Sequence, residues 1–241
     1  MKVLIAGLPK SGTTGLLYLL ASSCANKPRL LFEPKVCPAD LGTEGGDVIA
    51  KVLLGMNLDV ASFAHFDKKI TIVRDLRDRI VSALLYSQYH SNYLEDGERV
   101  RIVRECLMRK ESSPSTVSIS EILEAIGKVS GKQNSVAVHR ARVAKSITWF
   151  DDYVAAMPDG FLFKYEEFVS GNYDALEQHL GLRISGAADV PEGLQRVRRT
   201  KGHGNWRSWF TEEDVQEFKP LLSPWLEKYG YDADDWALSE K

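Results

Sequence analysis

A glycine-rich stretch near the amino terminus holds the first residues whose types and spacing could do chemistry. It reads GLPKSGTTG over residues 7–15 and directly follows the apolar run KVLIA. Glycines five residues apart, followed by hydroxyl side chains, are typical of a loop that binds phosphate through backbone N–H groups at the start of a helix. In the nucleoside-triphosphate loop GxxxxGK[ST] a lysine precedes the last hydroxyl, whereas Thr13 holds that position here. Lys10, at the apex of the loop, could instead reach a phosphate or its leaving oxygen.

A second candidate anion site follows the apolar run KITIV. Arg74 ends this run, and Ser82 comes eight residues later on a predicted helix. A planar guanidinium and a hydroxyl suit a terminal phosphate. The alternative is that Arg74 pairs with Asp75 or Asp78 and that Ser82 is an ordinary helix residue.

A glutamate is the first candidate for a general base. Glu33 ends the second apolar run in LLFEPK, and Pro34 fixes the turn beyond it. It could equally pair with Lys35 or cap a local turn. None of the five histidines has a paired acid at motif spacing. His90 and His139 are the alternative bases because they lie in helices that could face an acceptor, and no cluster of side chains predicts a metal site.

Five short apolar runs could supply the strands that position these residues. They are continuously apolar, which is typical of strands covered on both faces of a parallel sheet. A helical pattern follows the first run, so the glycine-rich stretch lies at the carboxyl end of a strand, where open α/β sheets bind ligands. We therefore predict an α/β fold of three layers with a central parallel sheet of about five strands. The runs are KVLIA (2–6), RLLFE (29–33), VIAKVLL (48–54), KITIVR (69–74) and GFLFKY (160–165).

Residues 85–158 interrupt this alternation and predict a helical excursion that could cover an acceptor. A serine-rich connector spans residues 111–120. Within it, Ser118 and Glu121 have the spacing of a capping box, which marks a helix start. A long helix is predicted over residues 136–157 from its apolar periodicity.

The carboxyl-terminal segment predicts one more helix. Thr211 and Asp214 have capping-box spacing, and we expect the helix that they begin to be broken near Pro220 and Pro224. With 241 residues and 44% hydrophobic content, the chain is predicted to form one domain over 1–241.

The charge balance and the cysteine content narrow the class of protein. The 31 basic and 33 acidic residues leave a net charge of −2, so no overall field favours nucleic acid or an anionic membrane. Three cysteines without CxxC spacing argue against a disulfide framework. Because no apolar run is long enough for a signal sequence or a spanning helix, we expect a cytoplasmic protein.

The string PKSGTT resembles the 5′-phosphosulfate loop of the sulfotransferases that use 3′-phosphoadenosine 5′-phosphosulfate. The stretch from Arg74 to Ser82 is similar to the 3′-phosphate motif of that family, in which many members carry proline where Leu76 stands. The resemblance implies a P-loop-kinase-like strand order. It assigns to the 5′-phosphosulfate the residues Pro9, Lys10, Ser11, Gly12, Thr13 and Thr14.

Two further stretches resemble the same family. RRTKGHGNW is similar to its Lys-Gly-x-x-Gly-x-Trp loop, with one residue fewer between the glycines. That resemblance implies contacts of Arg199, Lys201 and Gly202 with the 3′-phosphate. FKYEEF resembles the family's Tyr-Glu-Asp/Glu strand end, which implies that Tyr165 lies on the adenine side.

The acceptor side resembles one branch of the family more than another. Members that act on phenols carry a histidine in a Lys-Thr-His stretch, whereas the comparable residues here are Lys51, Val52 and Leu53. The Phe-Glu-Pro string is similar to carbohydrate sulfotransferases, in several of which the glutamate, here Glu33, is the candidate base.

The resemblance implies transfer of a sulfuryl group from 3′-phosphoadenosine 5′-phosphosulfate to a hydroxyl or amine of a small-molecule or carbohydrate acceptor. Adenosine 3′,5′-bisphosphate would be the product, Lys10 would stabilise charge on the leaving phosphate, and Glu33 would accept the proton. No metal, nucleic acid or membrane is expected to take part. Two rival functions are a P-loop small-molecule kinase, disfavoured by Thr13, and a non-catalytic nucleotide-binding module. The sequence leaves the acceptor and the oligomeric state open.

Overall fold

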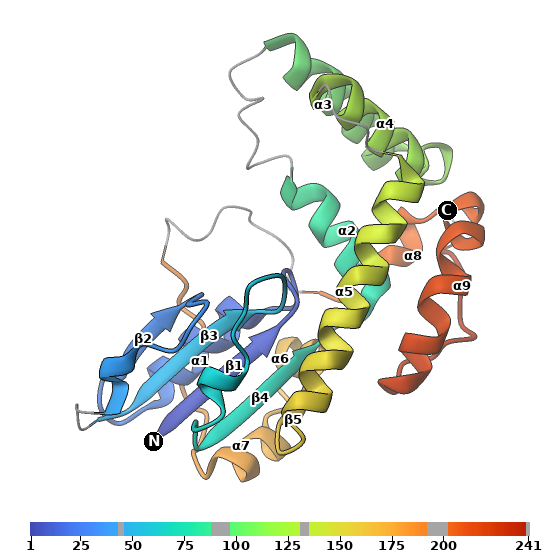
Figure 1. The fold of residues 1–241 in the computed structure, drawn as a ribbon. Coiled ribbons are helices and arrows are strands. Elements are labelled where there is room, and N and C mark those ends of the chain that lie inside the picture. Colours follow the sequence, from blue (N-terminus) through green and yellow to red (C-terminus); the bar gives the residue numbers. More distant parts are fainter. Residues whose placement is uncertain (43–45, 88–96, 131–134, 192–201, 240–241) are drawn as a thin grey trace. The chain divides into compact units, whose positions relative to one another are not determined.

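The computed structural model of the chain divides into two compact units (Figure 1). Unit 1 comprises Met1–Arg74 with Ser146–Lys201, and unit 2 comprises Asp75–Lys145 with Gly202–Lys241. A single domain over residues 1–241 stays a prediction. The residues that the structure describes are 1–42, 46–87, 97–130, 135–191 and 202–239.

Unit 1 contains a parallel sheet of five strands in the order β2-β3-β1-β4-β5. Each predicted apolar run forms one of these strands, and the predicted α/β class with a P-loop-like strand order is confirmed. The strands are β1 (Lys2–Gly7), β2 (Arg29–Phe32), β3 (Val48–Leu53), β4 (Lys68–Val73) and β5 (Phe161–Lys164).

The register of the sheet brings the candidate residues of unit 1 to one edge. Gly7, the last residue of β1, is paired with Leu53 of β3 and Ile72 of β4. Phe32 at the end of β2 is paired with Lys51, and Val73 at the end of β4 is paired with Lys164. The segments that follow β1, β2, β4 and β5 therefore all leave from the carboxyl edge, where parallel sheets bind ligands.

Helices cover both faces of the sheet. One face packs against α1 (Thr13–Ser23), α6 (Tyr165–Ser170) and α7 (Asp174–Leu180), whose leucines and Phe168 form a single core with the strands. Ile70 and Ile72 belong to this core, so the alternating Thr71 faces the other side. There Tyr153 of α5 (Val136–Ala156) is buried beside Thr71. The sheet is thus the middle of three layers.

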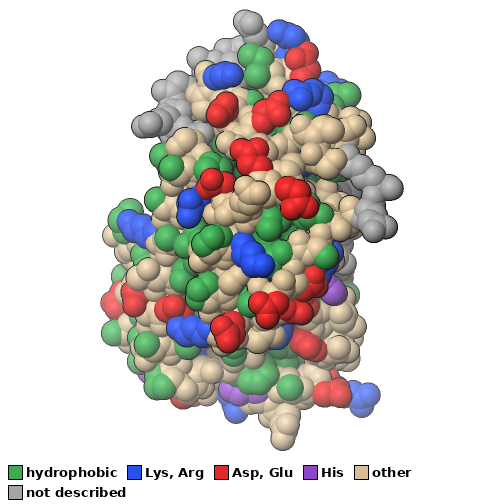
Figure 2. All heavy atoms as spheres, turned by 90° about the vertical axis from the view of Figure 1, so that its right-hand side faces the viewer, with side chains coloured by type: hydrophobic (Ala, Val, Ile, Leu, Met, Phe, Trp, Pro, Cys, Tyr) green, Lys and Arg blue, Asp and Glu red, His purple; other side chains and the backbone are tan. Residues whose placement is uncertain are grey.

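Unit 2 is helical. It contains α2 (Leu76–Ser87), α3 (Gly97–Ser112), the short 3₁₀ turn η4 (Pro114–Thr116), α4 (Ile119–Ser130), α8 (Trp206–Trp209), α9 (Glu212–Lys228) and the first part of α5. None of the described helices is long and apolar enough to cross a membrane. On the face that Figure 2 shows, acidic and basic side chains are interspersed.

The predicted helix starts are confirmed. Ser118 Oγ accepts the Glu121 N–H at 3.2 Å at the start of α4. Thr211 and Asp214 form both bonds of a capping box at the start of α9. The Asp214 carboxylate also accepts the Ile119 N–H at 2.9 Å, so it joins the starts of two helices that are far apart in the sequence.

The predicted break in the last helix is wrong. The helix α9 runs without interruption from Glu212 to Lys228 and contains Pro220 and Pro224. Each proline removes one helix hydrogen bond. Both prolines lie on the exposed face, and the opposite face is anchored by buried apolar side chains that hold the helix together. These are Phe218, Leu222, Trp225 and Leu226.

Candidate functional site

The glycine-rich loop connects β1 to α1 in unit 1. The Ser11 N–H donates to the Leu8 carbonyl at 3.2 Å, which closes the turn. Gly12 has a φ of 91° and the Leu16 N–H donates to its carbonyl at 3.1 Å, the first hydrogen bond of the helix. The N–H groups before Leu16 in the first turn have no helix carbonyl and point toward the loop, an arrangement that suits an anion.

Tyr165 packs directly on this loop. A Cβ added at Gly12 would lie 2.5 Å from Cδ2 and 2.8 Å from Cε2 of the Tyr165 ring. No side chain fits at either distance, so position 12 needs glycine both for its positive φ and for this close approach. The first residue after β5 is thereby fixed against the loop that follows β1.

Arg74 joins the same cluster from the end of β4. Its Nη1 donates to the Lys10 carbonyl at 3.0 Å, and its guanidinium lies 4.1 Å from the centroid of the Tyr165 ring. Its Nε is buried and has no hydrogen-bond partner among the described residues. Asp75, one of the two aspartates considered as partners of Arg74, pairs with Arg77. A buried guanidinium N–H without an acceptor fits a site that takes an anion.

Glu33 follows β2 and pairs with a lysine that sequence reasoning did not connect to it. The Glu33 N–H donates to the Lys51 carbonyl at 2.8 Å, and Lys51 Nζ donates to Glu33 Oε1. The Lys51 side chain is 2% exposed and that of Glu33 is 37% exposed. Burial lowers the pKa of Lys51, and the hydrogen bond to Glu33 opposes this effect. A lysine within the apolar run VIAKVLL requires a partner for its charge, which signals that Lys51 is paired but does not identify Glu33 as the partner.

Glu33 and the loop lie within the reach of one bound molecule. β2 is separated from β1 by one strand, and each strand spacing is about 4.8 Å, so the ends of β2 and β1 are about 10 Å apart. Lys51, between them on β3, is paired with Ile5 of β1 and Phe32 of β2. An acceptor hydroxyl at Glu33 and a phosphate at the loop could therefore be bound side by side.

The backbone of both candidate catalytic residues is strained. Among the described residues other than glycine, positive φ occurs at Lys10 (75°), Glu33 (57°) and Asn57 (69°). The left-handed conformation is unfavourable for lysine and glutamate and better tolerated by asparagine. Such strain tends to be retained where a side chain has to be aimed. All three residues follow the carboxyl ends of neighbouring strands, β1, β2 and β3.

The third predicted element lies partly in unit 2. Gly202 is half-buried. The Asp78 carboxylate accepts the Gly204 N–H at 2.6 Å and the Trp206 N–H at 2.9 Å, and Arg77 lies 4.2 Å over the Trp206 ring. The carboxyl end of the loop is thus attached to the first turn of α2, although sequence reasoning considered Asp78 only as a partner of Arg74.

The remaining predicted site residues are not brought together by either unit alone. Ser82 is buried on α2 in unit 2, whereas Arg74 belongs to unit 1, so their joint role stays a prediction. Arg199, Lys201 and His90 lie outside the described residues.

His139, the other alternative base, lies on α5 in unit 2. Its ring meets Phe218 edge-on at 6.1 Å. Burial lowers the pKa of His139 to about 4, and the positive charges of Arg142 and Arg79 lower it further. Such a histidine is neutral and weakly basic at pH 7.

No group of three or more histidine, cysteine or acidic side chains in the described part of the chain could hold a metal ion. In unit 1, the groups that could bind an anion are the backbone N–H groups of the loop, Lys10 and Arg74. Glu33 is the group that could accept a proton.

Comparison with known proteins shows the fold. No family model and no curated protein matches the chain. Among solved structures it is similar to mouse sulfotransferase SULT7A1 complexed with PAP, with a TM-score of 0.58 and 17% sequence identity. The similarity covers 98% of this chain and 89% of that one. The chain therefore has the fold of a sulfotransferase.

Proposed function

We propose that the protein is a sulfotransferase that uses 3′-phosphoadenosine 5′-phosphosulfate. The observation that carries the proposal is the contact of Arg74 with both Lys10 and Tyr165 in unit 1. It joins the loop after β1 to the ends of β4 and β5, so an anion on the loop and a second anion on Arg74 could belong to one nucleotide. A nucleoside triphosphate does not have a phosphate at each end of its nucleoside.

The residues present fit this donor. The first-turn N–H groups of α1 would hold the 5′-phosphate, together with the hydroxyls of Ser11, Thr13 and Thr14. Arg74, whose Nε has no acceptor among the described residues, would bind the 3′-phosphate. The resemblance of the sequence to the family's motifs also assigns to the 3′-phosphate the residues Ser82, Arg199, Lys201 and Gly202. It assigns Tyr165 to the adenine side.

The donor supplies a sulfuryl group attached to a phosphate leaving group. As the acceptor oxygen bonds to sulfur, the bond between sulfur and the bridging oxygen breaks. Lys10 would stabilise the charge that develops on that oxygen. Glu33 would accept the proton of the acceptor hydroxyl, and Lys51 would hold its carboxylate in place. The products are a sulfate ester and adenosine 3′,5′-bisphosphate.

A rival kinase function is weaker. Thr13 stands where a triphosphate loop has the lysine that contacts the β and γ phosphates. The backbone at Lys10 is left-handed. The Lys10 side chain therefore starts from a different position and direction than the lysine of a triphosphate loop, which lies in the first turn of the helix.

The substitution Glu33→Gln tests the proposal. It removes the proton acceptor and keeps the side chain's shape, so we expect kcat for sulfuryl transfer to fall by about 10²-fold or more. Transfer is measured with sulfur-labelled donor and a panel of alcohols, phenols and sugars. Stabilisation by adenosine 3′,5′-bisphosphate should be unchanged, because the proposal assigns Glu33 to the acceptor and not to the nucleotide.

A matched control is available in the same unit. Asp159 pairs with buried Lys69 at 2.6 Å, at the amino edge of the sheet. Asp159→Asn therefore breaks a comparable carboxylate–lysine pair away from the site and should leave kcat as in the wild type. Equal kcat values for Glu33→Gln and Asp159→Asn would show that Glu33 is not the base.

A further inference from the structure

The proposed mechanism does not use Asp78, a buried aspartate in the first turn of α2. This residue is 2% exposed. Its carboxylate accepts the Gly204 N–H at 2.6 Å and the Trp206 N–H at 2.9 Å. Burying a carboxylate is unfavourable unless it is hydrogen-bonded, and these two bonds offset that cost. They also attach residues 202–206, which we call the returning segment, to the start of α2.

The tryptophan that ends the returning segment is held to the same turn of α2 by its ring. Trp206 is buried, and the Arg77 guanidinium lies 4.2 Å from the centroid of its ring. Arg77 is itself fixed, because it forms an ion pair with Asp75 and its Nη1 donates to the Asp235 carbonyl at 2.6 Å. Arg77 thus holds the ring of Trp206 while Asp78 holds its backbone, which gives the returning segment a defined place on α2.

Ser82 lies one turn further along the same helix. Residues four positions apart lie on one helix face, about 6 Å apart along the axis. Asp78 and Ser82 are both buried. The returning segment is therefore attached to the face of α2 that carries Ser82. Since this segment begins with Gly202, the attachment joins within unit 2 two parts of the chain whose residues the resemblance assigns to the 3′-phosphate.

We propose that Asp78 is a positioning residue for binding of the 3′-phosphate: it holds the returning segment on the helix face that carries Ser82 and does not itself contact the nucleotide. The inference rests on the proposed function and on the assignment of Ser82 and Gly202 to that phosphate. Charge alone gives the opposite expectation, because a carboxylate repels a phosphate and its removal would then tighten binding. The direction of the change in affinity therefore distinguishes positioning from simple electrostatics.

The substitution Asp78→Asn tests the inference with two ligands that differ only in the 3′-phosphate, adenosine 3′,5′-bisphosphate and adenosine 5′-monophosphate. The amide keeps one oxygen acceptor but places its NH₂ group against the other backbone N–H, so it releases the returning segment. Hydrogen bonds to a charged group are each worth about tenfold or more in affinity. The Kd of the bisphosphate, measured by isothermal titration calorimetry, should therefore rise by about tenfold or more, and that of the monophosphate by less than about twofold.

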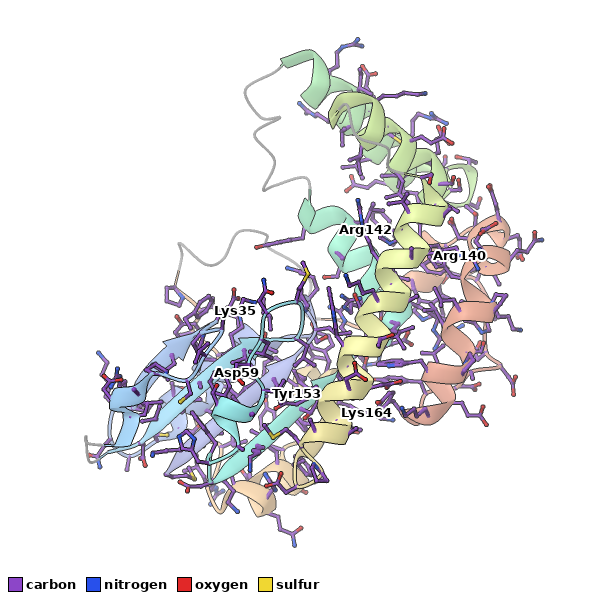
Figure 3. All side chains as sticks on the ribbon, in the orientation of Figure 1. Lys35, Asp59, Arg140, Arg142, Tyr153 and Lys164 are labelled. Atoms are coloured by element: carbon purple, nitrogen blue, oxygen red, sulfur yellow. The ribbon has the colours of Figure 1, made fainter. Side chains whose placement is uncertain are left out.

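Other contacts hold unit 2 together when Asp78 is replaced, and one of them supplies a matched control. Arg140, labelled in Figure 3, pairs with Glu217 at 3.0 Å and joins α5 to α9. Asp214 is 1% exposed and accepts backbone N–H groups at the starts of α4 and α9. It matches Asp78 in burial and in the kind of bond, but it holds a different part of the chain. Asp214→Asn should therefore leave both Kd values as in the wild type.

A pair of glycine substitutions gives the same test without a change of charge. Gly204 has a φ of 80° and Gly171 a φ of 75°, and a Cβ at either position would meet no atom of the described residues within 4 Å. Alanine is therefore strained in the same way at both positions, but only Gly204 lies in the returning segment. Gly204→Ala should raise the Kd of the bisphosphate several-fold and leave that of the monophosphate unchanged, whereas Gly171→Ala should bind both ligands as the wild type does.

The inference is overturned if the Kd of the bisphosphate in Asp78→Asn is unchanged or lower, if both ligands weaken equally, or if Asp214→Asn weakens the bisphosphate as much. Should Asp78→Asn fail to fold, the comparison of Gly204→Ala with Gly171→Ala decides in the same way. A wild type that binds the bisphosphate while the variants lose nothing leaves the proposed function standing. A wild type that does not bind the bisphosphate contradicts the proposed function, and the inference fails with it.

Discussion

Lys10 and Glu33 both hold a backbone conformation that residues with a Cβ rarely adopt. Conformations of this kind cost about 1–3 kcal/mol each and persist where the surrounding structure enforces them. At position 10 the Arg74 guanidinium holds the carbonyl, and at position 33 the backbone N–H is held by Lys51. The strain is thus maintained by the same contacts that build the site, which supports a functional role for both side chains.

Two substitutions of Lys10 separate strain from function. Lys10→Ala and Lys10→Gly both remove the ammonium group and should both abolish sulfuryl transfer. Only glycine also removes the left-handed strain, so Lys10→Gly should be more stable than Lys10→Ala by about 0.5–1 kcal/mol. Urea unfolding measures the difference. A Lys10→Gly variant that is no more stable, or that transfers sulfate at the wild-type rate, would contradict this account.

His139 should make unit 2 sensitive to acid. Burial, with Arg142 and Arg79, lowers its pKa from 6.5 to about 4 in the folded protein, so the unfolded chain binds the proton more readily. Its contribution to stability is complete above pH 6.5 and is lost as the pH falls toward 4. Between pH 7.5 and pH 5 the wild type should lose about 2 kcal/mol more than His139→Gln. Urea unfolding at both pH values checks this, and an equal loss in the two proteins would contradict it.

At the scale of elements, the candidate site is formed by the segments that follow four strands at the carboxyl edge of the sheet. The loop after β1, the turn after β2, and the residues after β4 and β5 are brought together by the parallel register. Gly12 is the position where two of them meet, because the Tyr165 ring occupies the space of a Cβ there. The geometry of the loop therefore depends on β5 as well as on β1.

A pair of glycine substitutions tests this dependence. Gly12 and Gly171 both have positive φ, but a Cβ at Gly171 would meet no atom within 4 Å. Gly171→Ala should therefore cost about 1 kcal/mol from backbone strain alone. Gly12→Ala adds the clash with Tyr165, so it should cost at least about 2 kcal/mol.

The same pair should differ in ligand binding. Gly12→Ala should also lose stabilisation by adenosine 3′,5′-bisphosphate, whereas Gly171→Ala should keep it. Thermal unfolding with and without the ligand measures both effects. Equal costs and equal ligand binding in the two variants would show that the contact between Gly12 and Tyr165 does not shape the loop.

The strands of the sheet could be predicted from sequence because each one is a short, mostly apolar run that is bounded by polar or turn-forming residues. Local signals also sufficed for the caps at Ser118 and Thr211. They failed at Pro220 and Pro224, where packing of the opposite helix face outweighs two lost hydrogen bonds. Within the site, the pairing of Glu33 with Lys51 depends on the register between β2 and β3, which no local pattern encodes.

At the scale of the whole molecule, the chain passes between its two units more than once. Unit 2 combines residues 75–145 with the carboxyl-terminal segment from Gly202, and Asp214 and Asp78 provide bonds that hold this segment to the earlier helices. The sequence predicts the two segments separately, because contacts between residues more than 90 positions apart leave no local pattern.

Thermal unfolding with nucleotide ligands tests the central claim most directly. Adenosine 3′,5′-bisphosphate at a hundred times its Kd should stabilise the protein by about 2.7 kcal/mol, which raises Tm by roughly 5–10 °C for a chain of this size. ATP with magnesium should give little or no shift, and Arg74→Ala should lose most of the shift with the bisphosphate. A shift with ATP and magnesium but none with adenosine 3′,5′-bisphosphate would contradict the account.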